Sequence, residues 1–136
     1  MTTLEVRNLR KNFGDVAALT DVSLTVQPGE IYGFVGSNGA GKSTTMRIIL
    51  GVLAADAGEV LWDGKLITAD NRRNIGYMPE ERGLYAKEKI LDQLVFLARL
   101  HGLGAQEATT NAQRLLEQLG LAERTTSQLT DLSLGN

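Results

Sequence analysis

The run Gly36-Ser37-Asn38-Gly39-Ala40-Gly41-Lys42-Ser43-Thr44 fits the pattern G-x-x-x-x-G-K-[ST] and constrains the fold more than any other feature of the sequence. Glycines in such a loop let backbone N–H groups turn inward without Cβ clashes, so the loop can surround an anion. The apolar run 31–35 before the loop predicts a strand. The run 43–50 after it predicts a helix that stops at Gly51. A strand, a glycine-rich loop and a helix in this order are typical of a phosphate-binding loop.

The loop also carries the side chains that a nucleoside triphosphate needs. Lys42 would be the point charge for the β- and γ-phosphates, and the hydroxyl of Ser43 would ligate Mg²⁺. The N-terminus of the following helix adds unpaired N–H groups and the positive end of its dipole. The alternative is a glycine-rich turn with an incidental lysine, which the flanking strand and helix disfavour. The sequence therefore predicts nucleotide and Mg²⁺ binding.

Composition excludes several other classes. The chain has 136 residues, 43% of them hydrophobic, which suits one ordinary domain with its own core. A net charge of −2 with interspersed signs leaves no basic patch, so we expect no direct nucleic-acid binding. The absence of cysteine excludes disulfides and thiolate metal sites. No signal-peptide pattern and no apolar run of membrane-spanning length is present.

The first part of the chain reads as mostly extended. Alternating apolar and polar residues over 4–9 and again over 18–26 predict two half-buried strands of an antiparallel layer. Residues 60–62 predict a strand that enters a tight turn at Asp63-Gly64. Residues 75–78 predict a further strand, and Arg72-Arg73 before it reads as a solvated turn.

The second part reads as helical. From Lys87 onward, apolar residues fall on one helical face up to His101, and Gly102 ends that helix. A second helix with one apolar face ends at Gly120, and that face consists of Ala108, Ala112, Leu115, Leu116 and Leu119. We therefore expect an ATP-binding core over residues 1–85 and a helical subdomain over residues 86–136.

Four motifs in this order resemble the nucleotide-binding domain of ABC ATPases, over essentially the whole chain. Leu9-Arg10-Lys11-Asn12-Phe13-Gly14 looks like the segment whose aromatic residue stacks on adenine, and the phosphate loop is the second motif. Ile75-Gly76-Tyr77-Met78-Pro79-Glu80 looks like the strand leading into the Q-loop. Leu132-Ser133-Leu134-Gly135-Asn136 looks like a variant of the LSGGQ signature.

The resemblance implies an α/β fold of the P-loop NTPase class, with an antiparallel β layer, an incomplete parallel core sheet and a helical subdomain. It implies that Phe13 and Val16 form the adenine platform and that Glu80 joins Ser43 at Mg²⁺. Lys42 and Glu80 would serve catalysis. Ser133 and Gly135 would act on the nucleotide of a second ATP-binding subunit. A transmembrane permease would hold the protein at the cytoplasmic face of the membrane.

Two departures from the family pattern bear on activity. Glu80 stands where the family has glutamine; a carboxylate keeps an oxygen for Mg²⁺ but changes how water is positioned. The apolar run before Asp63 resembles a Walker B strand, but Gly64 follows where the catalytic glutamate belongs, and His101 reads as structural. We expect the complete protein to hydrolyse ATP and this chain alone not to. We also expect this chain to self-associate through an uncovered sheet edge.

Residues Met78 to Tyr85 look most like ATP-binding subunits of bacterial exporters of the ABC-2 type. The alternative is a soluble ABC-family ATPase that acts on nucleic acid or ribosomes, which basic insertions or a second cassette would favour. A GTPase is disfavoured because no aspartate has glycine three residues later. The transported substrate is not encoded in any of these motifs.

Overall fold

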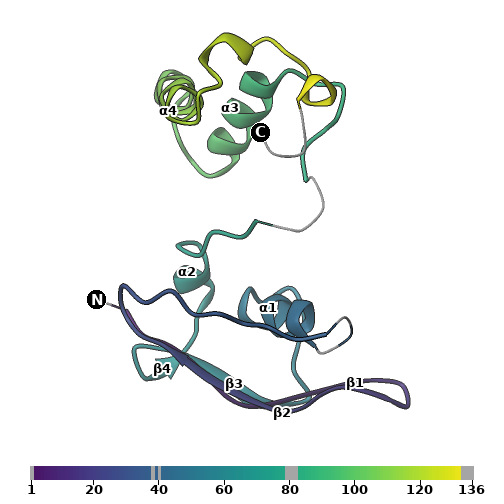
Figure 1. Cartoon of the computed structure of the whole chain (residues 1–136). Coiled ribbons are helices and arrows are strands. Elements are labelled where there is room, and N and C mark those ends of the chain that lie inside the picture. Colours follow the sequence, from purple (N-terminus) through teal and green to yellow (C-terminus); the bar gives the residue numbers. More distant parts are fainter. Residues whose placement is uncertain (1, 38, 40, 79–82, 133–136) are drawn as a thin grey trace. The chain divides into compact units, whose positions relative to one another are not determined.

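The computed structural model describes residues 2–37, 39, 41–78 and 83–132 (Figure 1). Its contacts divide the chain into two compact units, Met1–Tyr77 and Met78–Asn136. The first unit carries the sheet and the second is helical.

The sheet of the first unit is antiparallel throughout. Its strands are β1 (Leu4–Phe13), β2 (Val16–Val26), β3 (Ala57–Trp62) and β4 (Lys65–Leu66), in the spatial order β2-β1-β3-β4. The predicted antiparallel layer is thus present. Strand β1 continues to Phe13 and β2 begins at Val16, so both strands are longer than the predicted ranges 4–9 and 18–26. The turn between β3 and β4 has positive φ at both Asp63 and Gly64, as a type I′ hairpin requires.

Helix α1 (Lys42–Ile49) lies over one face of this sheet (Figure 1). It ends before Gly51, whose φ of 76° terminates the helix as predicted. A short helix, α2 (Ala69–Arg72), follows the β3–β4 hairpin and begins with a capping box from Thr68. The core of this unit is apolar throughout and consists of Val6, Leu9, Leu19, Ile48, Ile49 and Val60.

A β-bulge at Asn8 sets which side chains of β1 reach that core. Strict alternation would put Val6 and Leu9 on opposite faces of the sheet, yet both are buried in the same cluster. Asn8 has a φ of 49°, and the pairing of β1 with both neighbours shifts register around it. Opposite the bulge, a Cβ atom on Gly58 would lie 2.4 Å from the carbonyl oxygen of Asn8. Glycine at position 58 is therefore required by the bulge.

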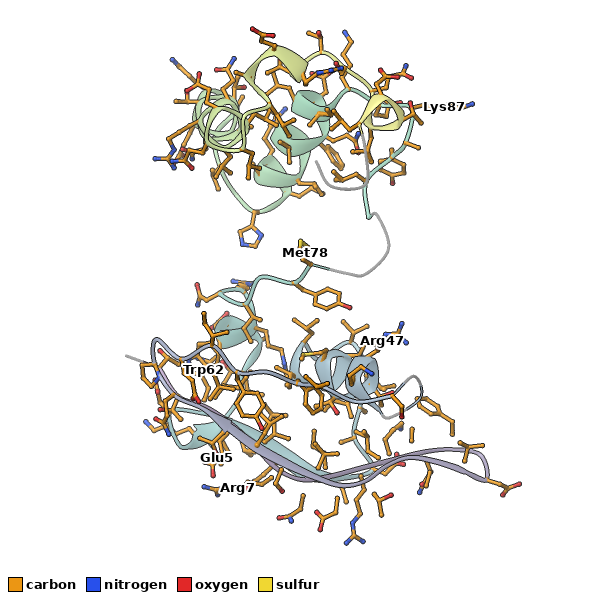
Figure 2. All side chains as sticks on the ribbon, in the orientation of Figure 1. Glu5, Arg7, Arg47, Trp62, Met78 and Lys87 are labelled. Carbon is orange, nitrogen blue, oxygen red and sulfur yellow. The ribbon has the colours of Figure 1, made fainter. Side chains whose placement is uncertain are left out.

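The other face of the sheet carries charged side chains. Glu5 and Arg7 project from β1 on the side away from α1 (Figure 2), and their side chains form an ion pair of 2.7 Å. Arg7 also lies 3.5 Å from Glu59 on β3. These pairs place charged groups on this face, beside Leu61, which lies opposite Glu5 and is buried.

Two runs that the sequence predicted as strands are not strands in the described chain. Residues 31–35 and 75–78 carry no strand pairing, and the side chains of Ile31 and Val35 are 99% and 94% exposed. An apolar run becomes a strand only where a neighbouring backbone offers hydrogen bonds, and no described residue offers them here.

The second unit is built on α3 (Ile90–Leu100) and α4 (Ala105–Gln118), followed by two short 3₁₀ turns, η1 (Ala122–Arg124) and η2 (Leu129–Asp131). Both predicted helices are present and end just before Gly102 and Gly120, which have positive φ. The apolar core consists of Ile90, Leu116, Leu129 and Leu132. On the predicted packed face of α4, Ala108, Ala112 and Leu116 are buried as expected, whereas Leu115 and Leu119 are exposed.

Candidate functional site

The phosphate-binding loop ends directly at helix α1. Gly41 is the N-cap with φ 80°, and Lys42 is the first helical residue. The ammonium of Lys42 turns back over the loop and donates to the carbonyl oxygens of Gly36 and Ser37, the latter at 2.7 Å. The cation is therefore held at the loop, at the N-terminus of a helix.

Gly41 is fixed by a close approach of the loop to strand β2. A Cβ atom at this position would lie 2.3 Å from Cδ2 of Leu19 and 2.7 Å from the carbonyl oxygen of Ala18. The positive φ adds strain for any other residue. The sequence pattern identified this glycine, and the structure shows that its place is set by packing as well as by the turn.

The first turn of α1 is anchored through Thr45. Its backbone N–H and its hydroxyl both donate to the carbonyl oxygen of Gly41, at 2.8 and 3.0 Å, and its side chain is fully buried. Among the described residues, no side chain caps this helix end and no acidic residue lies in its first turn. Within the described residues the positive end of the helix dipole therefore has no side-chain partner, which favours an anion there.

Phe13 lies at the end of β1, beside the same part of the sheet. It pairs with Val16 across the hairpin, and its side chain is 51% exposed. Two residues earlier, Lys11 pairs with Leu19, the residue that Gly41 contacts. Two residues of strand span about 7 Å, so the fold brings the proposed adenine platform and the loop together.

The remaining predicted site residues are placed as follows. Ser43 is exposed and Thr44 half-buried in the first turn of α1. The structure describes Gly39 with φ 86° and open space around it. Five predicted residues lie outside the described residues, so their roles remain predictions: Asn38, Ala40, Glu80, Ser133 and Gly135.

Sequence reasoning missed a contact near the ring. Lys11 lies with its ammonium 5.7 Å from the centroid of Phe13 and 2.7 Å from the carboxylate of Asp56. Lys11 and Phe13 are two residues apart in a strand, so the sequence already indicated that their side chains lie on the same face. Asp56 is 45 positions from Lys11 in the sequence, and no sequence pattern indicated a contact between them.

Two further polar side chains hold backbone in place. Arg72, predicted as part of a solvated turn, donates from Nε to the carbonyl oxygen of Ile49 at 3.0 Å, because the C-terminal carbonyls of α1 need donors. Gln93, buried on α3, accepts from the N–H of Tyr85 at 2.7 Å and donates to the carbonyl oxygens of Tyr85 and Glu88 at 2.9 and 3.0 Å. The sequence feature that could have identified Gln93 is its position as a polar residue within an apolar helix.

Comparison with known proteins agrees with this arrangement. The family described as ABC transporter matches residues 19–136. The ABC transporter ATP-binding protein YhaQ of Bacillus subtilis is 40% identical over 98% of this chain and 45% of its own length. The lipopolysaccharide export system ATP-binding protein LptB of Escherichia coli is 35% identical over 99% of this chain and 58% of its own length.

A solved structure described as the ATP binding subunit of an ABC transporter superposes with a TM-score of 0.78 and 32% identity, over 97% of this chain and 56% of that one. The chain thus spans about half the length of the relatives it matches. Within the described ranges, no helix has the length and apolar character needed to cross a bilayer. With its loop at the start of α1, its antiparallel layer and its helical unit, the chain belongs to the ATP-binding proteins of ABC transporters.

Proposed function

We propose that this chain binds the triphosphate of ATP in the loop that runs from Gly36 to Thr44. The observation that carries the proposal is the position of Lys42, whose ammonium is held by loop carbonyls beside an uncapped helix N-terminus. An ammonium has three protons, so one remains for a phosphate oxygen beyond the two that the carbonyls take. The N–H groups of the first turn add further donors for the phosphates.

The adenine base would stack on Phe13, with Val16 as its neighbour across the hairpin. Partial exposure of the ring supports this role, since a ring packed in the core offers no face to a ligand. Stacking does not read the edges of a base. We therefore expect little discrimination between ATP and GTP.

A magnesium ion fits the donor set at the loop. Mg²⁺ keeps several waters and takes one or two protein oxygens together with substrate phosphates. The exposed hydroxyl of Ser43 lies in the first turn of α1, and the described residues hold no group of three His, Cys, Asp or Glu that would form a separate metal cage. Ser43 and Glu80 would hold the ion, which would neutralise charge on the phosphates when bound.

For the whole protein, we propose that ATP hydrolysis powers export through a transmembrane permease at the cytoplasmic face of the membrane. The name of the relative LptB, which belongs to an export system, supports this class. Ser133 and Gly135 would close over the nucleotide of a second ATP-binding subunit, and Lys42 and Glu80 would act in catalysis. Within residues 1–136 no apolar run is followed by an Asp-Glu pair, so this stretch alone would bind ATP without hydrolysing it.

The experiment is a calorimetric titration of the chain with ATP and Mg²⁺, compared between the unaltered protein and Lys42→Ala. Loss of a charge-assisted contact costs about 1.5 to 3 kcal/mol, so we expect affinity to fall about 10- to 100-fold. Lys65→Ala, an exposed lysine in the β3–β4 hairpin, is the control and should leave the affinity unchanged. Equal titration curves for Lys42→Ala and the control would contradict the proposal.

A further inference from the structure

The end of β1 that carries Phe13 has weaker support from the sheet than the rest of the strand. Pairing with β3 ends at Arg10, which lies opposite Ala57, so residues 11–13 are paired in the described chain with β2 alone. A two-stranded tip moves more freely than the interior of a sheet. An aromatic ring there needs another restraint if it is to present one fixed face.

Asp56, just before β3, supplies that restraint to the backbone. Its N–H donates to the carbonyl oxygen of Arg10 at 2.9 Å, and its Oδ2 accepts from the N–H of Asn12 at 2.7 Å. The aspartate thus bonds to β1 on both sides of Lys11, beyond the last regular pair with β3.

Lys11 links the carboxylate of Asp56 to the ring of Phe13. Its ammonium lies 2.7 Å from Oδ1 of Asp56 and 5.7 Å from the ring centroid of Phe13, within the range of a cation–π contact. The Lys11 side chain is only 15% exposed, although lysine is usually solvated. The ammonium lies over one face of the ring, and Phe13 is still 51% exposed, so part of its surface stays accessible to a ligand.

We propose that Lys11 and Asp56 are positioning residues that hold the Phe13 ring so that a purine base stacks on the face opposite the ammonium. This inference rests on the proposed function, because the base is that of the ATP bound at the loop. Neither residue touches the phosphates in this arrangement. Both act through the ring.

The test separates base stacking from phosphate binding by using two ligands, ATP and inorganic tripolyphosphate, each with Mg²⁺. Lys11→Met keeps the apolar stem of the side chain and removes its charge. We expect its ATP affinity to fall about 2- to 5-fold, which corresponds to the loss of an exposed cation–π contact. Its affinity for tripolyphosphate should stay the same. Asp56→Asn should act in the same direction. Arg7→Met is the matched control, since it breaks an ion pair on the same strand on the face away from α1 (Figure 2), and it should change neither affinity.

The decisive measurement repeats Lys11→Met in a Phe13→Ala background. If Lys11 acts through the ring, the double variant binds ATP no worse than Phe13→Ala alone. Three outcomes would overturn the inference while leaving ATP binding intact. Lys11→Met could weaken ATP and tripolyphosphate equally, it could weaken ATP binding as much in the Phe13→Ala background as in the unaltered chain, or it could leave ATP affinity unchanged. Failure of the unaltered chain to bind either ligand would instead overturn the proposed function, and this inference with it.

Discussion

The ammonium of Lys42 lies 2.7 Å from the carbonyl oxygen of Ser37, five residues earlier in the same loop. The bond closes the loop on its own lysine, so the cation stands at the site before any phosphate arrives. Binding a polyphosphate then requires little rearrangement of the side chain, and the entropy of ordering a long lysine is lost on folding and not on binding.

Gly41→Ala should damage both the loop and the fold. The new methyl group would collide with Leu19 and with the carbonyl oxygen of Ala18, at a φ that alanine disfavours. We expect a loss of about 1 to 3 kcal/mol in the free energy of unfolding, measured by urea denaturation, together with loss of ATP binding. Gly33→Ala is the control, since its φ is not positive and its surroundings are open. Equal stability of the two variants would show that the loop can move away from β2.

Arg72→Ala should destabilise the first unit more than Arg73→Ala. Arg72 donates to the last turn of α1 through the carbonyl oxygen of Ile49, and losing such a bond costs about 0.5 to 1.5 kcal/mol. The side chain of Arg73 forms a 3.4 Å pair with Asp70 in which both side chains are largely exposed, so its removal should change stability by less than about 0.5 kcal/mol. Urea unfolding of both variants measures the difference, and the reverse order would refute the capping role.

Gln93→Ala should loosen the segment before α3. The amide makes three hydrogen bonds to the backbone of Tyr85 and Glu88, and truncation removes the acceptor that holds the N–H of Tyr85. We expect faster hydrogen exchange at the N–H of Tyr85 in the variant, with no change in the sheet of the first unit. The exposed Gln113→Ala on α4 serves as the control. Unchanged exchange at Tyr85 would show that other contacts hold this segment.

The contribution of Asp56 to stability should depend on pH. Hydrogen bonds from Lys11 and from the N–H of Asn12 lower the pKa of Asp56 below its ordinary 3.8. A carboxylate whose pKa is depressed by folding stabilises the fold above its unfolded pKa and loses this effect as pH falls through the folded pKa. The stability difference between the unaltered chain and Asp56→Asn should therefore be constant from about pH 7 to 5 and shrink below about pH 4. Asp15→Asn provides the comparison, and a difference that does not shrink as the pH falls below about 4 would contradict the ionic account.

The 136-residue chain should self-associate at micromolar concentration without nucleotide. Ile31, Val35 and Met78 are 99%, 94% and 91% exposed, and apolar side chains in unpaired, extended segments favour contact between copies. Association should persist in Lys42→Ala, because it does not use the ATP site, and weaken when Ile31 and Val35 are replaced by serine. Light scattering measures the mass. A compact monomer for the unaltered chain would show this prediction to be wrong.

The sequence predicted features that depend on local chemistry and missed those that depend on distant partners. The positive-φ glycines 51, 102 and 120 marked the ends of helices, and Asp63-Gly64 marked a hairpin, since each of these needs only its own backbone. The loop was identified from its own residue pattern, and Phe13 was identified from the resemblance to ABC ATPases. By contrast, the strands expected at 31–35 and 75–78 need another backbone beside them, and the Lys11–Asp56 pair joins positions far apart in the chain.

The bulge at Asn8 has a consequence for how this strand tolerates changes in length. Asn8 is the extra residue of the bulge, so deleting it would restore strict alternation and leave the later residues of β1 on their present faces. Deleting Arg10 instead, beyond the bulge, would turn Lys11 and Phe13 over, so that Lys11 would leave Asp56 and the ring would move to the opposite side of the sheet. Position 8 is therefore a place where β1 can lose a residue without reversing the aromatic ring.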